Sequence, residues 1–238
     1  MSSAVAVPRL AASLILLRDG ADSTEVMMVE RTGSASFAAG KFVFPGGAVD
    51  AADATLATGN AADATLRVTA IRETYEECGL LLAEPEPEAV APAADFQTLL
   101  RKGGFALATD RLVPFAHWIT PPHLPKRFDT HFFLARGPSR QAAAADLREV
   151  MSAAWLRPSA VVAAAEACEL NLMFATYMNL RWLARYNTVT AALAAARERP
   201  IVTVVPEPSD SPEGRLFRIP EAAAYGETAV LENRFRRA

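Results

Sequence analysis

The chain has 238 residues, enough for one large domain or two small ones. Its 24 Lys and Arg residues are nearly balanced by 27 Asp and Glu residues, and the formal net charge is −3. This balance lacks the basic excess on which general binders of nucleic acids and of anionic membranes rely, so we expect a small-molecule partner, no nucleic acid and no membrane.

The first fifty residues have the pattern of short β-strands. Residues 12–31 read as two strands rich in Val, Ile and Leu, joined by a Gly/Asp/Ser turn, and residues 40–47 as a third strand that Pro45 stops. The apolar run at 10–17 is far shorter than the ~20 residues of a membrane-spanning helix. A turn-like segment follows it rather than a signal cleavage site, so we interpret the run as a buried strand.

A helix is predicted from Asn60 to Gly79, because apolar residues there recur every three or four positions. Asn60 or Asp63 can cap its start, and Gly79 can end it in the left-handed conformation. The apolar stripe consists of Ala64, Val68, Ile71, Tyr75 and Cys78.

The rest of the chain alternates between strands and helices. A proline-rich acidic connector precedes a short predicted helix at 96–103. Further strands are expected at 111–120, 127–136 and 149–158, helices at 159–171 and 173–198, and an edge hairpin from 200–208 and 215–220. This order favours a mixed α/β layer structure over a helical bundle or a β-sandwich.

The two cysteines, Cys78 and Cys168, are far apart and lack the spacing of metal ligands or of a small disulfide framework. We interpret them as non-catalytic thiols of a reducing compartment and expect a cytoplasmic protein. The histidines His117, His123 and His131 also show no metal-ligand spacing, and we interpret them as structural or exposed.

The segment 70–80, AIRETYEECGL, carries three glutamates on one face of the predicted helix, Glu73, Glu76 and Glu77. Their mean direction is roughly 170° from the apolar stripe, so we expect them to face away from the core. A solvated acidic face is the simpler interpretation. However, like charges at this spacing repel by several tenths of a kcal/mol per pair, and a divalent cation such as Mg²⁺ or Mn²⁺ would offset the repulsion. Arg72, four residues before Glu76, can hold that carboxylate.

These residues resemble the Nudix box, whose pattern is G-x5-E-x7-R-E-U-x-E-E-x-G-U with U aliphatic. Gly47 takes the first position, and RETYEECGL at 72–80 takes the last part of the pattern. Asp53 stands where the box has its first glutamate. It is separated from Arg72 by 18 residues rather than 7, which implies an 11-residue insertion (18 − 7) at about 54–64. Thr74 stands at an aliphatic position.

Two further segments are similar to the coenzyme A-cleaving branch of the family, which includes a peroxisomal coenzyme A diphosphatase. Arg31 and Gly40 match the signature that precedes the box in that branch, although Thr32 replaces its serine and Ser36 its arginine. Downstream, WITPPHLPKRFDTHFF at 118–133 resembles a second segment of that branch.

The resemblance implies a Nudix-type α/β/α sandwich with a mixed sheet and a C-terminal helical extension. We expect residues 1–160 to form the core, and 161–238 to form an extension and tail packed on it within the same domain. A homodimer is compatible with this organisation.

The resemblance also implies a reaction, in which water attacks a phosphoanhydride with the aid of Mg²⁺ or Mn²⁺. We assign Glu73, Glu76 and Glu77 as metal ligands, together with the Gly46 carbonyl by resemblance. The general base is either Glu77 or Glu149; for Glu149 a solvated loop acid is an equal alternative. The implied substrate is coenzyme A or an acyl-coenzyme A, cleaved to 3′,5′-ADP and 4′-phosphopantetheine or its acyl derivative.

Substrate contacts are expected next to Gly47. Arg31, Lys126 and Arg127 are candidates for the phosphates, with surface or ion-pair roles as the alternative. Phe37 or Phe128 can stack on adenine, or belong to the core. ADP-ribose or another dinucleotide is the alternative substrate. A module that senses nucleotides without hydrolysis is the alternative class, although it would have no need of three mutually repelling carboxylates.

Overall fold

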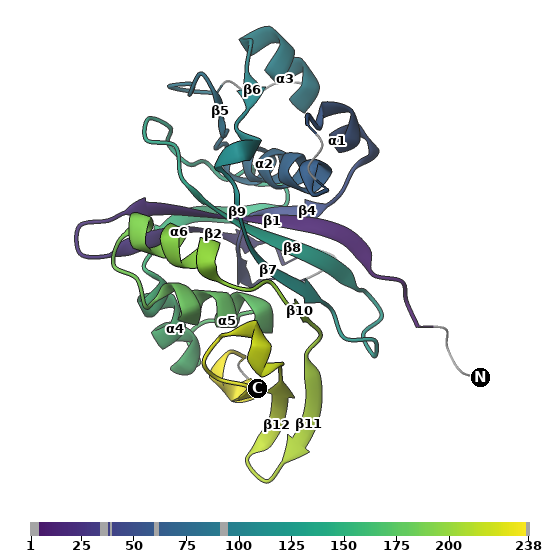
Figure 1. Ribbon diagram of the computed structural model, residues 1–238. Coiled ribbons are helices and arrows are strands. Elements are labelled where there is room, and N and C mark those ends of the chain that lie inside the picture. The colour runs from purple at the N-terminus through teal and green to yellow at the C-terminus, as the bar shows by residue number, and fades with distance from the viewer. Residues whose placement is uncertain (1–4, 34–37, 39, 60–61, 91–94, 237–238) are drawn as a thin grey trace.

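An eight-stranded mixed sheet separates two groups of helices in the computed structural model (Figure 1). The structure describes residues 5–33, 38, 40–59, 62–90 and 95–236. The strands of the sheet are β1 (Arg9–Asp19), β2 (Thr24–Arg31), β3 (Phe42–Val43), β4 (Gly46–Ala48), β7 (Val113–Ile119), β8 (Phe128–Arg136), β9 (Val150–Leu156) and β10 (Thr203–Val204). They run in the order β10-β7-β8-β1-β2-β3, with β4 paired to β1 and β9 paired to β2.

The central strand β1 contains the apolar run predicted to be a buried strand, and this prediction is confirmed. It pairs in parallel with β8 and antiparallel with β2 and β4. Residues 11–17 are all buried, a continuous pattern that is typical of a strand covered on both faces.

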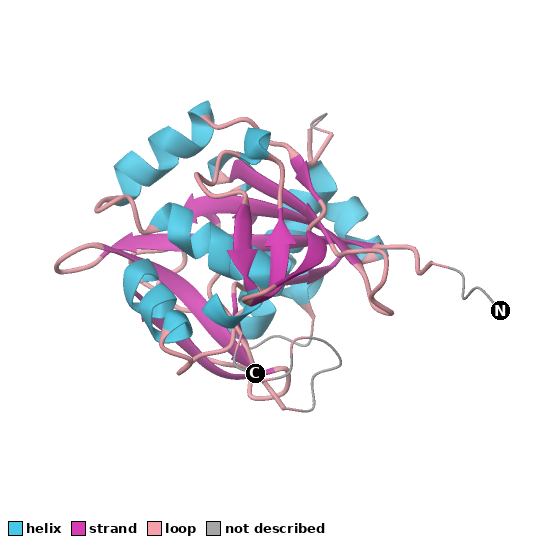
Figure 2. Ribbon diagram, turned by 90° about the horizontal axis from the view of Figure 1, so that it is seen from below, coloured by secondary structure: helices cyan, strands magenta, loops and turns pink. Residues whose placement is uncertain are grey.

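Helices cover both faces of the sheet, as expected for an α/β/α sandwich (Figures 1 and 2). One face carries α1 (Ala51–Leu56), α2 (Ala64–Cys78) and α3 (Phe96–Gly103), and the other carries α4 (Pro158–Glu166), α5 (Phe174–Leu183) and α6 (Val189–Glu198). Side chains of β1 point alternately to the two faces of the sheet and so contribute to two hydrophobic cores. Leu14 and Leu16 pack with Ile71 of α2, and Ile15 and Leu17 belong to the core that contains α5. Within the described residues, no helix combines the length and the apolar character needed to cross a membrane.

The predicted helix that carries the glutamates begins later than expected, at Ala64. Asp63 is its N-cap residue but makes no side-chain cap hydrogen bond; its carboxylate pairs instead with Arg67 at 2.9 Å. Asn60 lies outside the described residues. Gly79 ends the helix with φ 72°, and its N–H donates to the Tyr75 carbonyl at 2.8 Å, so the left-handed C-terminal cap is confirmed.

The C-terminal part is helical only as far as Glu198, and strands follow it. β10 extends the edge of the main sheet, parallel to β7. The predicted strand at 215–220 does not pair with it: β12 (Gly214–Arg218) joins β11 (Glu207–Ser211) and β13 (Ala229–Leu231) in a separate three-stranded sheet. Pro206 lies between β10 and β11 and offers no N–H to a ladder, which separates the two pairings. The remaining short elements are β5 (Ala83–Glu84), β6 (Ala106–Leu107), η1 (Thr109–Arg111), η2 (Glu221–Ala223) and η3 (Glu232–Arg234).

Candidate active site

The three glutamates of α2 lie along the line where this helix meets β4. They differ strongly in burial: the side chain of Glu76 is 45 % exposed, whereas Glu77 is only 2 % exposed. The expectation that the whole acidic face points away from the protein interior is therefore wrong for Glu77. The reason is that β4 lies against this side of the helix, so the acidic face is partly covered by main chain.

Glu77 is held by two donors from different elements. One carboxylate oxygen accepts from Arg31 Nη1 at 3.0 Å, and the other accepts from the Gly46 N–H at 3.0 Å. Burial raises the pKa of Glu77 to about 8, against the opposing influence of Gly46 and Arg31. The ionised form of this carboxylate is thus poorly solvated, and a nearby cation would stabilise it.

Gly46 and Gly47 allow β4 to approach both the helix and β1. A Cβ atom on Gly46 would lie 2.6 Å from the Ala12 carbonyl oxygen, and one on Gly47 would lie 2.5 Å from the Glu73 carboxylate. Both distances are far below van der Waals contact. Glycine is therefore required at Gly46, where a side chain would meet main chain, whereas at Gly47 the end of the Glu73 side chain would have to move.

Replacing Gly47 by alanine is expected to push the Glu73 carboxylate out of place. Because the displaced group is the end of a flexible side chain, the cost should be about 1 kcal/mol of unfolding free energy, while Mn²⁺ binding should weaken by on the order of tenfold. Gly33→Ala is the matched control, because a Cβ at Gly33 would meet no atom of the described residues within 4 Å. Thermal unfolding and Mn²⁺ titration by electron paramagnetic resonance measure both effects. Wild-type Mn²⁺ affinity in Gly47→Ala would contradict the inferred role of this glycine.

Arg72 uses all the N–H groups of its guanidinium to hold neighbouring oxygens in place. Nε and Nη2 donate to the two carboxylate oxygens of Asp53 at 2.7 and 3.0 Å, and Nη2 also donates to the Ala48 carbonyl at 3.2 Å. Nη1 donates to Glu73 at 2.9 Å and to Glu76 at 2.7 Å. The expectation that Arg72 can hold the Glu76 carboxylate is therefore confirmed, and the same guanidinium also holds Asp53 and Glu73.

Asp53 is fully buried at the start of α1 and anchors Arg72. Besides Arg72, it accepts from the Asp50 N–H at 2.9 Å and from the Thr69 hydroxyl at 2.7 Å. Burial by itself would raise the pKa of Asp53, but these donors together hold it below its ordinary value. The first acidic position of the box thus connects α1 to α2 through Arg72.

Arg31 links Glu77 to Glu149. Its Nη2 lies 3.6 Å from a carboxylate oxygen of Glu149, a loop residue whose side chain is 66 % exposed. The Asp146 side chain fixes this loop by accepting from the main-chain N–H groups of Arg148, Glu149 and Val150. Among the described residues, no atom accepts a hydrogen bond from the buried Nε of Arg31.

A cavity of about 590 Å³ opens beside these residues, within the size range of small-molecule sites. Its lining includes Glu73, Glu76 and Glu149 at the acidic end. The cationic residues in its lining are Arg9, Arg31, Lys41, Arg72, Lys126 and Arg236. Its apolar lining includes Phe44, Trp118, Phe128, Phe132, Phe174, Phe217 and Phe235. Acidic, basic and apolar surfaces therefore meet in one continuous space.

Some of the predicted substrate-binding residues line the cavity and others do not. Gly47, Arg31, Lys126 and Phe128 line the cavity. Arg127 is not among the lining residues: its guanidinium donates to the main-chain carbonyls of Thr120 at 2.9 Å and Ala6 at 2.7 Å. Phe37 and Ser36 lie outside the described residues.

Part of the cavity wall consists of aromatic residues that the sequence did not indicate as site residues. Phe174, Phe217 and Phe235 form a cluster with ring centroids 5.0 to 5.6 Å apart. They come from α5, β12 and the end of η3, and Phe235 is tied in place because its carbonyl accepts from the Leu172 N–H at 2.8 Å. Only the packing of the C-terminal segment brings these rings together.

The carboxylates fit a divalent cation. Glu73, Glu76 and Glu77 offer hard oxygen donors of the kind that Mg²⁺ and Mn²⁺ prefer. Burial raises the pKa of Glu73 despite the opposing charge of Arg72, and Glu76 and Glu149 raise it further. A group of carboxylates whose charges oppose one another in this way is stabilised by a bound cation.

Comparison with known proteins gives consistent results. A family model described as the NUDIX domain matches residues 7–173. A Caenorhabditis elegans protein named "Putative nudix hydrolase 7" is 30 % identical over 164 residues, which is 65 % of this chain and 53 % of that protein. The chain thus spans about half the length of this curated relative. The crystal structure of a NUDIX hydrolase from Alicyclobacillus acidocaldarius is 29 % identical and superposes with a TM-score of 0.67, covering 80 % of this chain and 97 % of that chain.

Proposed function

The chain belongs to the Nudix family, and from this we propose that it is a divalent-metal-dependent hydrolase of coenzyme A or an acyl-coenzyme A. The reaction would cleave the phosphoanhydride and yield 3′,5′-ADP and 4′-phosphopantetheine or its acyl derivative. The observation that carries the proposal is the cavity in which the acidic end, several cationic side chains and an aromatic wall are continuous.

In this proposal Glu73, Glu76 and Glu77 hold the metal ion, together with the Gly46 carbonyl. A bound Mg²⁺ or Mn²⁺ supplies charge neutralisation at the phosphates and lowers the pKa of a coordinated water. The donor set described above suits these ions, and the main chain at Gly46 already contacts the Glu77 carboxylate through its N–H at 3.0 Å.

The protein's own groups would orient the reactants. Water attacks one phosphorus atom of the anhydride, the bridging P–O bond breaks, and a carboxylate accepts the proton of the water. Glu149 is a candidate for this base because its exposed side chain lines the cavity, and Glu77 is the other. Arg31 supplies charge for the phosphates, since it lines the cavity beside the exposed Glu149.

Two properties of the cavity lining support coenzyme A over ADP-ribose in this proposal. It carries a third phosphate, and Lys41 and Lys126 add positive charge to the lining beyond Arg31, whereas Arg236 is paired there with Glu232 at 2.9 Å. An acyl-coenzyme A also carries an apolar chain, which the wall formed by Phe174, Phe217 and Phe235 would bury. ADP-ribose has no apolar chain to bury there. The match of Arg31 and Gly40 to the signature of the coenzyme A-cleaving branch supports the same choice.

We expect acyl-coenzyme A to be hydrolysed in the presence of Mg²⁺ or Mn²⁺, with kcat/KM rising as the acyl chain lengthens from acetyl to hexanoyl. Each buried methylene contributes about 0.8 kcal/mol, or up to roughly fourfold. Assays with coenzyme A, acyl-coenzyme A, ADP-ribose, NADH and diadenosine polyphosphates, with products identified by mass, test this. Preferred cleavage of ADP-ribose would reassign the substrate. Binding of all these nucleotides without any turnover would favour a sensor.

A further inference from the structure

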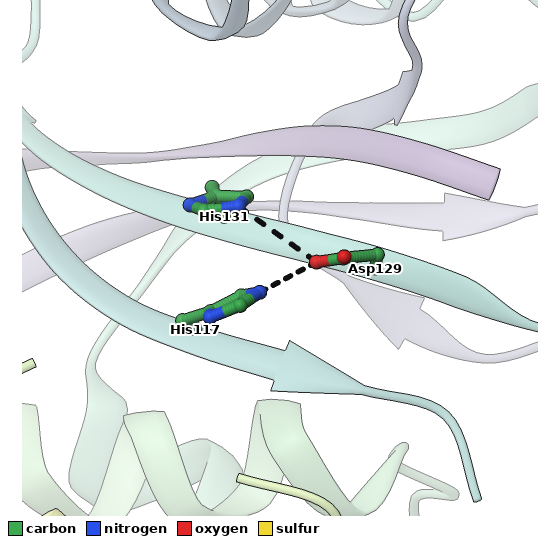
Figure 3. A group of neighbouring side chains, drawn as sticks. All are labelled: His117, Asp129 and His131. Carbon is green, nitrogen blue, oxygen red and sulfur yellow. Dashed lines mark hydrogen bonds and ion pairs between the residues drawn. The ribbon is translucent and has the colours of Figure 1, made fainter. Parts of the chain in front are cut away.

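The face of the sheet that α2 covers carries, on β7 and β8, a second group of ligand-type side chains, His117, Asp129 and His131 (Figure 3). We propose that these residues form a site for a transition-metal ion of the Zn²⁺ class, separate from the carboxylate site of α2. In the sequence these histidines show no metal-ligand spacing, because the register of two strands, and not their separation along the chain, brings them together.

Strand register places the group away from the cavity. In the β7–β8 ladder, His117 is directly opposite His131, and Trp118 is directly opposite Thr130. Trp118 and Thr130 line the cavity. Because side chains alternate between the faces of a strand, the two histidines and Asp129 lie on the opposite face of the sheet. An ion held there would lie across the sheet from Trp118 and Thr130, on the face that α2 covers.

The three side chains converge on one point. Nε2 of His117 lies 2.5 Å from Asp129 Oδ1, and Nε2 of His131 lies 3.7 Å from the same oxygen. The imidazole rings are stacked, with centroids 4.1 Å apart and planes 18° apart. One ligand atom from each residue lies within 4.8 Å of the others, so a single cation can be reached by all of them.

Hydrogen bonding alone leaves part of this arrangement unexplained. It accounts for the pair His117 and Asp129, but at 3.7 Å the Nε2 atom of His131 is beyond hydrogen-bond distance from the oxygen toward which it points. A second imidazole directed at the same carboxylate adds a further nitrogen donor within reach of a cation bound beside Asp129.

The donor chemistry identifies the class of metal. Two imidazole nitrogens and one carboxylate oxygen suit Zn²⁺, Co²⁺ or Ni²⁺, whereas Mg²⁺ prefers oxygen alone. The other nitrogen of His117, Nδ1, lies 2.8 Å from the Thr203 hydroxyl. A metal-bound histidine usually donates its second N–H to such a partner, which fixes the ring and directs the remaining nitrogen at the ion. All three side chains are only partly buried, so an ion can enter and water can complete its coordination.

The position of the site indicates a structural role. Its ligands join β7 to β8, and Thr203 connects them to β10 at the edge of the sheet. The loop between β7 and β8 carries Leu124 and Lys126, which line the cavity on the other face. A bound ion would therefore stabilise the hairpin that supplies this part of the cavity wall.

The experiment is a Co²⁺ and Zn²⁺ titration of the full chain after removal of metal with a chelator. The chain has three histidines, and the third, His123, is exposed in the hairpin loop and serves as the control. We expect wild type and His123→Ala to bind one equivalent of Co²⁺ with a visible spectrum typical of nitrogen ligands. His117→Ala and His131→Ala should lose at least about 100-fold in affinity at this site. Zn²⁺ should raise the midpoint of thermal unfolding in the first two proteins only.

A second pair of variants separates this site from the carboxylates of α2. Asp129→Asn keeps the side-chain shape and should also lose the site, while Glu76→Gln should retain it. Circular dichroism verifies that each variant is folded. The proposal is overturned if wild type binds no Zn²⁺ or Co²⁺, if the two histidine variants bind them as wild type does, or if Glu76→Gln abolishes the signal that the histidine variants keep.

Discussion

Replacing Glu76 by glutamine is expected to lower turnover at least about 100-fold while the protein remains folded. In the proposed function this side chain is a metal ligand, and loss of its charge weakens the ion that neutralises the phosphates. The fold should tolerate the change, because the side chain is 45 % exposed and its contact is the bond from Arg72 Nη1 at 2.7 Å. A glutamine oxygen can accept the same bond.

Steady-state hydrolysis at saturating Mg²⁺ and thermal unfolding of the metal-free protein together test this expectation. Glu88→Gln is the matched control, since Glu88 is an exposed acid that pairs with Arg140 and does not line the cavity. It should leave both measurements unchanged. Full activity in Glu76→Gln would remove this carboxylate from the proposed mechanism, and a large loss of stability would show that its role is structural.

Replacing Asp53 by asparagine is expected to cost about 3–5 kcal/mol of unfolding free energy, because it leaves Arg72 without the charge of its buried partner. For a chain of this size the midpoint of thermal unfolding should fall by roughly 10 °C. Asp53 accepts hydrogen bonds from Arg72, the Asp50 main chain and Thr69. The NH₂ group of an asparagine cannot accept these hydrogen bonds and would face their donors instead. Turnover should fall as well, since Arg72 positions Glu73 and Glu76.

Asp50→Asn is the control on the same helix. The Asp50 side chain is exposed and caps α1 by accepting from the Ala52 N–H at 2.8 Å, and asparagine caps helices equally well. The unfolding free energy of this variant should stay close to that of wild type. Equal stability of the Asp53 and Asp50 variants would contradict the anchoring role of Asp53.

The effect of Asp53 should also depend on pH. Its pKa in the folded protein lies below the ordinary value of about 3.9, so its charge stabilises the fold above that pH. As the pH falls through the folded-state pKa, this stabilisation is lost. The difference in unfolding free energy between wild type and Asp53→Asn should therefore be full near pH 6 and shrink below about pH 4.

Periodicity and local motifs predicted much of the fold. The apolar run of β1 and the three-to-four spacing of α2 each arise from burial within one segment. The type of each element can therefore be predicted from the residues of that segment alone. The cap at Gly79 follows from its neighbours in the same way. The division of the tail into β10 and a separate hairpin could not be predicted, since it depends on which distant strands β10 and β12 meet.

In the candidate site, too, contacts between residues distant in the sequence could not be predicted. The spacing of Glu73, Glu76 and Glu77 indicated a shared face, but not that β4 would bury Glu77 beneath it. The sequence indicated Asp53 as the first acidic position of the box, but not its contact with Arg72, which joins residues 19 positions apart. His117 and His131 are opposite one another only through the β7–β8 register. Such contacts are properties of the assembled sheet, and no local pattern carries them.

The full use of the Arg72 donors has a consequence for ligand binding. Because the guanidinium is anchored by Asp53 and Ala48, it restricts the rotamers of Glu73 and Glu76 in the folded chain. The conformational entropy of these side chains is thus lost during folding and not when an ion binds. The carboxylate site is preorganised, and a lysine at position 72, with a flexible stem and a compact charge, could not restrict both glutamates in this way.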